Sequence, residues 1–113
     1  MKYIGGKERG EFSKRVVRVA LEIPTGRVTT YGRIAKAAGG GGMAAQSITT
    51  ILGKAYQEGE RRIPFHRIVY ADGRVWLSAE YETKRKALYK KEGIMLDKTG
   101  RVANFADLLW EFP

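Results

Sequence analysis

Apolar residues recur at helical spacing in the first half of the chain, and prolines and glycines divide this pattern into short segments. The first segment begins at Glu11 and stops after Ile23 at Pro24 and Gly26, which break helices. Its apolar side chains repeat at the interval of one helical face: Phe12, Val16, Val19, Ala20 and Ile23. A helix this short is stable only when its apolar face packs against other elements. The sequence therefore predicts a mainly helical domain built from short helices.

Two further short helices are predicted on either side of a run of glycines. The first spans residues 31–38, and a hydroxyl of the preceding threonines can cap its free amide groups. Glycines 39–42 supply the turn. In the second helix, at residues 42–54, apolar residues face one side and small polar residues face the other. Two short helices joined by a glycine turn are typical of a helix-turn-helix, although any αα-hairpin has the same pattern.

Short β-hairpins and one more helix are predicted in the second half of the chain. An Asp-Gly pair predicts a small hairpin or a loop at residues 67–76, and a second hairpin is expected at residues 94–102. The helix between them begins at Ser78 and ends before Gly93, with acidic residues near its start and lysines near its end. The apolar tail, residues 105–110, is expected to fold back onto the core.

Length and residue usage predict one domain without covalent or metal staples. The 113 residues suit a single domain, 1–113, and we expect residues 1–10 to be a flexible N-terminal segment. The absence of cysteine excludes disulfides and thiol catalysis, and a single histidine argues against a zinc or haem site, so no metal or cofactor is expected. No apolar run reaches the roughly 18 residues that span a bilayer. The sequence thus predicts a soluble, cytoplasmic protein.

Positive charge is the strongest global signal in the sequence. The chain has 21 Lys and Arg residues against 12 Asp and Glu residues, which gives a formal net charge of +9 at pH 7. Such an excess favours a polyanionic partner and predicts salt-dependent binding to nucleic acid. A basic surface that serves only solubility is the alternative. A membrane partner is not expected, because no helix pairs a lysine face with a face of Trp, Phe and Leu.

Residues 64–67, Pro-Phe-His-Arg, resemble a reactive site that lacks its nucleophile. A buried histidine such as His66 can activate a neighbouring thiol or hydroxyl, whereas the ring of Phe65 can only pack or stack. We therefore expect recognition without turnover. Ser78 and Tyr70 are the alternative nucleophiles, but neither belongs to a triad-like or metal-like arrangement in the sequence.

Several separated motifs of this chain occur together in one known family. They are Ile23-Pro24-x-Gly26-x-Val28-x-Thr30-Tyr31-Gly32, Ile63-Pro64-Phe65-His66-Arg67-Ile68-Val69, Asp72-Gly73, and Glu92-Gly93 after a basic helix. With these motifs the chain resembles, over nearly its whole length, the alkyltransferase-like proteins, which are cysteine-lacking relatives of O6-alkylguanine-DNA alkyltransferases. In the transferases the second motif reads Pro-Cys-His-Arg, and the cysteine accepts the alkyl group. Phe65 occupies that position here.

The resemblance implies a fold and a function. The fold would be mainly α with short β-hairpins, a winged-helix or helix-turn-helix DNA-binding domain like the C-terminal domain of the alkyltransferases. The protein would enter the minor groove of double-stranded DNA, turn an O6-alkylguanine out of the base stack and hold it in a pocket. Without a thiol the alkyl group is not transferred, and in this family the stable complex flags the damage for nucleotide excision repair proteins. We expect a non-catalytic monomer.

A different class of function stays open. A winged-helix regulator would read undamaged DNA by placing the helix at residues 42–54 in the major groove. It would show sequence preference, whereas lesion recognition depends on the alkylated base. The motif at residues 64–67 favours lesion recognition.

The resemblance also assigns two sets of site residues. The lesion pocket would be lined by Tyr31, Phe65, Arg67, Trp76, Leu77 and Ser78. The DNA-binding residues would be Thr30, Tyr31, Arg33, Ala45, Gln46, Ser47, Thr50 and Lys54. His66 and Glu92 match the pair that activates the thiol in the transferases and are expected here to orient their loop. For the aromatic residues of the lesion pocket, packing in the core is an alternative role that stays open. For Arg67, the favoured role is to anchor its loop by hydrogen bonds to backbone carbonyls.

Some positions depart from the family pattern. Gln46 stands where the family has an arginine that fills the gap left by the flipped base, and glutamine brings no charge. Thr49 and Thr50 stand where relatives often have glycines. The loop at residues 76–78 also differs from the usual pocket lid. These departures predict a lesion affinity or a binding geometry that differs from that of the relatives.

Overall fold

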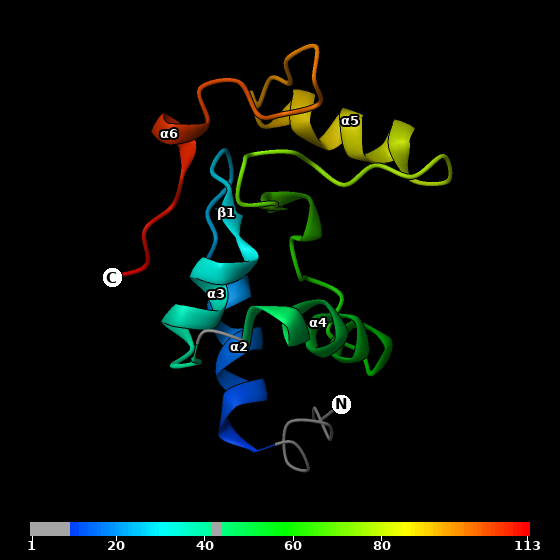
Figure 1. Ribbon diagram of the computed structural model, residues 1–113. Coiled ribbons are helices and arrows are strands. Elements are labelled where there is room, and N and C mark those ends of the chain that lie inside the picture. Colours follow the sequence, from blue (N-terminus) through cyan, green and yellow to red (C-terminus); the bar gives the residue numbers. More distant parts are fainter. Residues whose placement is uncertain (1–9, 42–43) are drawn as a thin grey trace.

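The computed structural model describes residues 10–41 and 44–113 and confirms a mainly helical fold (Figure 1). Its elements, in chain order, are α2 (Glu11–Leu21), β1 (Thr29–Thr30), α3 (Tyr31–Ala37), η1 (Ala44–Ser47), α4 (Ile48–Gln57), η2 (Phe65–Arg67), β2 (Ile68–Val69), α5 (Glu82–Lys91) and α6 (Phe105–Leu108). The flexible segment predicted at residues 1–10 lies, apart from Gly10, outside the described residues, as does Gly42. In the described part of the chain, no helix has the length and apolarity needed to cross a membrane.

Helices α2, α3 and α4 pack around the larger of two hydrophobic clusters, in the lower part of Figure 1. Helix α2 ends at Leu21, before the predicted end, but Ile23 is still buried in the same cluster. The buried face of α2 is rotated from the predicted one, because Val17 is buried whereas Val19 is only half-buried. The buried positions of this helix follow one helical face: Ser13, Val16, Val17 and Ala20.

Helix α3 and the turn that follows it have the local features that their sequence predicts. Thr30 is the N-cap of α3, and its hydroxyl accepts a hydrogen bond from the amide of Arg33 (3.2 Å). At Gly40 the chain passes close to both α2 and η1. A Cβ atom there would lie 2.5 Å from the Cβ of Ala44 and 2.8 Å from the ring of Phe12, so only glycine fits. The helix predicted after this turn is divided into the short 3-10 helix η1 and the α-helix α4.

The two-stranded sheet does not include the reversal predicted at residues 67–76. The chain does reverse there, since the amide of Tyr70 donates to the carbonyl of Arg74 (3.0 Å). Strand β2 nevertheless pairs with β1 in parallel, with Thr29 opposite Ile68 and Thr30 opposite Val69. Both residues of β2 are buried, and so are their partners Thr29 and Thr30 in β1. The Asp-Gly signal therefore marks a loop, which is one of the two alternatives predicted for residues 67–76.

Helix α5 and the C-terminal segment surround a second, smaller hydrophobic cluster. Helix α5 begins at Glu82 rather than at Ser78, because residues 78–81 form a separate turn. Tyr89 is its only described residue in the buried class, so α5 contributes to the second cluster mainly through this one side chain. The reversal predicted at residues 94–102 is present as an antiparallel bridge between Leu96 and Val102.

The C-terminal tail folds back onto the core, as predicted. Val28 and Leu109 form a parallel bridge, and the amide of Trp110 donates to the carbonyl of Val28 (2.7 Å). Phe105 and Leu108 pack against the second cluster. In Figure 1 this red segment descends beside β1.

We expect substitution of Ile48 by alanine to lower the free energy of unfolding by about 2–5 kcal/mol, because the cavity that it leaves cannot collapse fully. Ile48 is fully buried (0% exposed) at the start of α4, in the larger cluster. Urea denaturation followed by circular dichroism measures the loss. Gln57→Ala, at the exposed end of the same helix, is the matched control. Equal losses for the two variants would contradict the assigned core.

Candidate functional site

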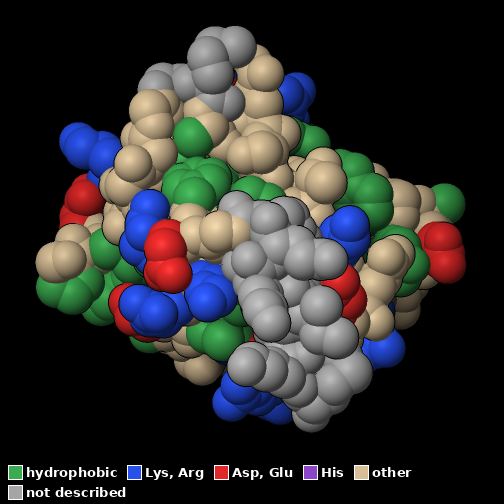
Figure 2. Space-filling view, turned by 90° about the horizontal axis from the view of Figure 1, so that it is seen from below, with side chains coloured by type: hydrophobic (Ala, Val, Ile, Leu, Met, Phe, Trp, Pro, Cys, Tyr) green, Lys and Arg blue, Asp and Glu red, His purple; other side chains and the backbone are tan. Residues whose placement is uncertain are grey.

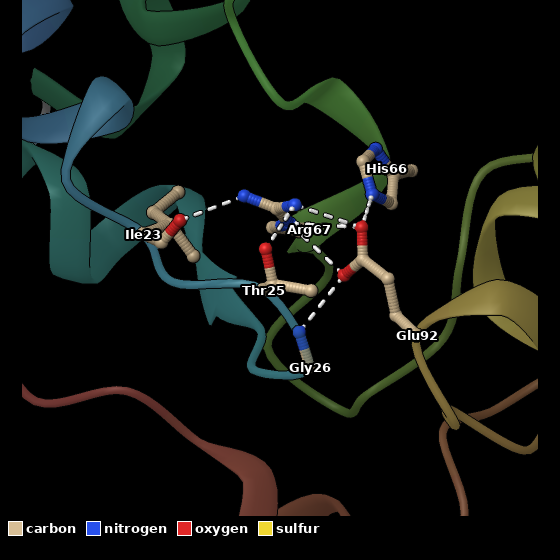
Figure 3. Close-up of polar contacts among 6 residues, drawn as sticks. All are labelled: Ile23, Thr25, Gly26, His66, Arg67 and Glu92. Carbon is tan, nitrogen blue, oxygen red and sulfur yellow. Dashed lines mark hydrogen bonds and ion pairs between the residues drawn. The ribbon is translucent and has the colours of Figure 1, made fainter.

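The carboxylate of Glu92 joins three separate segments of the chain (Figure 3). Its Oε1 accepts a hydrogen bond from the amide of Gly26 (2.9 Å), and its Oε2 accepts one from Nε2 of His66 (2.6 Å). Arg67 donates to both oxygens, from Nε to Oε1 (3.0 Å) and from Nη2 to Oε2 (2.8 Å). The side chain of Glu92 is only 6% exposed. We call these four residues the Glu92 cluster.

Arg67 extends this cluster to the loop that follows α2. Its Nη1 donates to the carbonyl of Ile23 (2.9 Å), and its Nη2 donates to the hydroxyl of Thr25 (3.0 Å). Gly26 has a φ of +84°, a conformation that favours glycine, and in it the Gly26 amide reaches Glu92. Arg67 thus makes the loop-anchoring contacts favoured for it from the sequence.

Burial and hydrogen bonds within the Glu92 cluster determine the protonation states of Glu92 and His66. Burial disfavours the charged form of Glu92, but hydrogen bonds from Arg67, Gly26 and His66 outweigh burial and lower the pKa of Glu92 to about 2. Burial also lowers the pKa of His66, and this effect exceeds the opposing effect of Glu92. A neutral His66 at pH 7 must carry its proton on Nε2 to donate to Glu92, which leaves Nδ1 unprotonated. The site thus keeps an ionised carboxylate and a neutral imidazole beside Phe65.

Phe65 is part of the wall of two cavities. The first, which we call the α4 cavity, has a volume of about 510 Å³ and is lined by Tyr31, Ala45, Gln46, Thr49, Phe65, Tyr70, Trp76 and Arg85. The rings of Tyr31 and Tyr70 lie 5.9 Å apart between centroids. Burial raises the pKa of Tyr31, so its hydroxyl stays protonated and can donate a hydrogen bond. The α4 cavity therefore combines aromatic walls with hydroxyl and amide groups.

The second cavity, which we call the α5 cavity, is more basic. It has a volume of about 530 Å³ and is lined by Tyr56, Arg61, Arg62, Ile63, Pro64, Phe65, His66, Arg67, Trp76, Tyr81, Lys84, Arg85 and Leu88. The guanidinium group of Arg61 lies 4.4 Å from the ring centroid of Tyr56. Phe65, Trp76 and Arg85 line both cavities.

The residues assigned to a lesion pocket are divided between different places. Tyr31, Phe65 and Trp76 line the α4 cavity, whereas Arg67 lines only the α5 cavity. Leu77 packs against the second hydrophobic cluster and lines neither cavity. The hydroxyl of Ser78 is buried without a hydrogen-bond partner among the described residues, and Ser78 also lines neither cavity.

The residues assigned to DNA binding lie at the end of β1 and along α3, η1 and α4. Gln46, Ser47, Thr50 and Lys54 are exposed, and Ala45 is half-buried. Thr30 is buried because it caps α3, and Arg33 forms an ion pair with Glu111 near the C-terminal end. The exposed members thus follow one stretch of the chain, from η1 to the last turn of α4.

Three residues of the α4 cavity, Thr49, Tyr70 and Arg85, were not assigned to either set of site residues from the sequence. Tyr70 follows β2 and is 39% exposed, and Arg85 reaches both cavities from α5. The guanidinium of Arg85 lies 5.2 Å from the ring centroid of Trp76. Of Tyr70 and Arg85, only Tyr70 had a sequence signal that could have pointed to the site, because it directly precedes the predicted reversal.

Charged side chains of both signs occur on the face seen from below in Figure 2. Outside the grey residues, Lys and Arg lie beside Asp and Glu, with hydrophobic side chains exposed between them. The described residues of this face do not form one continuous basic surface. Within residues 10–41 and 44–113, no group of three or more His, Cys, Asp or Glu residues is arranged to hold a metal ion.

Comparison with known proteins gives consistent matches. The family described as 6-O-methylguanine DNA methyltransferase, DNA binding domain, matches residues 11–94. A protein of Escherichia coli named DNA base-flipping protein is 35% identical over 97 residues, covering 85% of this chain and 72% of that protein. A protein of the same name from Vibrio parahaemolyticus is 32% identical over 93 residues, covering 82% of this chain and 90% of that protein.

Solved structures agree with these sequence matches. The structure of S. pombe Atl1 in complex with damaged DNA containing O6-carboxymethylguanine has a TM-score of 0.65 and 26% identity. It covers 90% of this chain and 96% of that one. A variant of the M. tuberculosis O6-methylguanine methyltransferase has a TM-score of 0.57 and 28% identity, covering 79% of this chain and 53% of that one.

We expect Glu92→Gln to lower the free energy of unfolding at pH 7 by about 3 kcal/mol, because the half-buried guanidinium of Arg67 (17% exposed) loses its charged partner. The wild-type protein should also lose stability in acid. A carboxylate whose pKa is lowered from 4.5 to about 2 contributes stability that is complete above pH 4.5 and is lost as pH falls towards 2. His66, with its lowered pKa, acts in the same direction at higher pH.

Urea denaturation of both proteins between pH 7 and pH 3 tests this expectation. The stability of Glu92→Gln should depend less on pH than that of the wild-type protein. Glu80→Gln, at an exposed position before α5, should leave the pH dependence unchanged. Parallel curves for Glu92→Gln and the wild-type protein would overturn the assigned role of the carboxylate.

Proposed function

We propose that this chain, which belongs to the alkyltransferase-like proteins of the 6-O-methylguanine DNA methyltransferase DNA-binding family, recognises O6-alkylguanine in double-stranded DNA without repairing it. The observation that carries the proposal is the position of Phe65. It precedes His66 and lines the α4 cavity, in a chain that has no cysteine. A phenyl ring cannot accept an alkyl group, but it can stack on or enclose a base.

The α4 cavity has the size and the walls that an extrahelical base requires. Its volume of about 510 Å³ lies within the range of roughly 300–1,000 Å³ that is usual for small-molecule sites. Tyr31, Phe65, Tyr70 and Trp76 offer aromatic surfaces for stacking, which offsets part of the cost of removing a base from the duplex. The names of the relatives support this use, since those from E. coli and V. parahaemolyticus are called DNA base-flipping proteins.

We place the DNA along η1 and α4, with the minor groove against them. Ala45 and Ser47 are small, which lets a backbone approach the floor of a narrow groove. Gln46 is exposed and lines the α4 cavity, and we propose that its side chain enters the gap left by the flipped base. The S. pombe relative was solved with damaged DNA, which supports this class of partner.

The proposed output is a persistent complex rather than a chemical product. His66 is neutral and its Nε2–H donates to Glu92, yet its neighbour Phe65 has no proton to give up. The lesion therefore stays intact and the complex can present it to nucleotide excision repair proteins. We propose that the protein does this as a cytoplasmic monomer without a cofactor.

Fluorescence anisotropy on matched duplexes tests this function. One duplex contains a single O6-methylguanine and the other contains guanine at the same position. We expect tighter binding of the lesion duplex, with protein mass and lesion both unchanged in mass spectrometry of the complex. Equal affinity for the two duplexes would favour the undamaged-DNA regulator, and a methylated protein would reveal an acceptor such as Ser78 or Tyr70.

Phe65→Ala should weaken binding of the O6-methylguanine duplex about tenfold, because one aromatic wall of the α4 cavity is lost. Tyr31→Phe should weaken it by a smaller factor, because only a hydroxyl is removed. Neither change should affect the guanine duplex to the same extent. Phe105→Ala, which removes a partly buried ring that lines neither cavity, is the control. Equal losses on both duplexes would exclude Tyr31 and Phe65 from the pocket.

Lys54→Ala should weaken binding of both duplexes by the same factor. Lys54 is exposed in α4, where it can neutralise a phosphate but carries no information about the base. The slope of log affinity against log salt concentration should become smaller by about one unit. A loss confined to the lesion duplex would place Lys54 in the pocket instead of on the DNA backbone.

A further inference from the structure

The α5 cavity has no part in the function proposed above, although it has features of a binding site. Among the described residues, the large hydrophobic side chains in the exposed class are Tyr56, Tyr70, Trp76, Tyr81 and Met95. All except Met95 line the α4 cavity or the α5 cavity. Exposed aromatic groups gathered at a cavity mark a surface that awaits a ligand.

The charges of the α5 cavity favour an anionic ligand. Its described lining contains arginines, a lysine and a neutral histidine, and it contains no aspartate or glutamate. Two of these cations have carboxylate partners, since Arg62 pairs with Glu60 and Arg67 pairs with Glu92.

The other cations of this cavity are not neutralised in the same way. Within the described part of the chain, no ion pair involves Arg61, Lys84 or Arg85. Arg61 and Arg85 lie instead over the rings of Tyr56 and Trp76, at 4.4 Å and 5.2 Å from the ring centroids. A guanidinium that stacks on a ring keeps its N–H groups available at its edge.

The position of the α5 cavity connects it with the proposed base pocket. Phe65, Trp76 and Arg85 are common to the linings of both cavities. Phe65 stands where the transferases carry the acceptor of the O6 substituent. If a base occupies the α4 cavity as proposed, a substituent that points towards Phe65 would meet the residues that the two cavities share.

We infer that the α5 cavity receives the anionic end of a carboxylate-bearing O6 substituent, and that Arg61 and Lys84 determine this specificity. This inference rests on the function proposed above, because it requires the base to occupy the α4 cavity. The aromatic rings enclose the carbon chain of the substituent, and the two cations bind its carboxylate. The protein thereby favours anionic adducts over neutral adducts of the same length.

Binding to a set of duplexes that differ at one base tests the inference. The base is guanine, O6-methylguanine, O6-propylguanine or O6-carboxymethylguanine, of which only the last carries an additional negative charge. We expect the wild-type protein to bind the carboxymethyl duplex about tenfold more tightly than the propyl duplex at low salt. Arg61→Gln with Lys84→Gln should abolish this ratio and leave the ratio of O6-methylguanine to guanine unchanged.

A matched double variant controls for the loss of net charge. Arg18→Gln with Lys98→Gln removes the same charge from exposed positions that line neither cavity, and it should keep the carboxymethyl preference. Arg85 is left intact because it contributes to both cavities.

The outcomes separate the inference from the function on which it rests. Equal binding of the propyl and carboxymethyl duplexes, with O6-methylguanine still preferred over guanine, would overturn the inference alone. A uniform loss on every duplex in the Arg61 and Lys84 variant would overturn it by assigning these cations to the DNA phosphates. No preference for any alkylated base over guanine would overturn the proposed function itself.

Discussion

The arrangement of the site depends on one buried carboxylate. Glu92 receives hydrogen bonds from Gly26, His66 and Arg67, so it fixes the loop after α2, the short helix η2 and the end of α5 relative to one another. Phe65 directly precedes His66, and Arg85 lies in the helix that ends just before Glu92. The walls of both cavities are therefore positioned by the same contact. Because the contact is charged and largely shielded from water, losing one partner leaves another charge without compensation.

The sequence predicted those parts of the fold that depend on local chemistry. The N-cap at Thr30, the glycine turn before η1 and the return of the C-terminal tail follow from cap, turn and burial preferences. For residues 67–76 the sequence left a hairpin and a loop open, because the choice between an antiparallel neighbour and β1 as the partner of β2 depends on burial in the folded core. The start of α5 was also placed too early, since a turn at residues 78–81 satisfies the same local signals as a first helical turn.

The candidate site could be predicted only in part for the same reason. The pairing of His66 with Glu92 was implied by the resemblance to the alkyltransferases, and in the structure Nε2 of His66 lies 2.6 Å from Oε2 of Glu92. The division of the surroundings of Phe65 into two cavities could not be predicted, because it depends on Tyr70 and Arg85, which only the tertiary fold brings together. The net charge indicated a polyanionic partner, but it did not show that arginines stacked on aromatic rings lie at one cavity. That arrangement depends on which arginines form ion pairs with carboxylates in the folded protein.

The parallel pairing of β1 and β2 ties the two hydrophobic clusters to each other. Ile68 belongs to the larger cluster and the adjacent Val69 to the smaller one, because successive side chains of a strand point to opposite faces. A strand of two residues cannot detach from one cluster without also withdrawing its other side chain from the second. Local opening of either half is thus coupled to opening of the other, and the amide hydrogens of the two clusters should exchange with solvent as one cooperative unit.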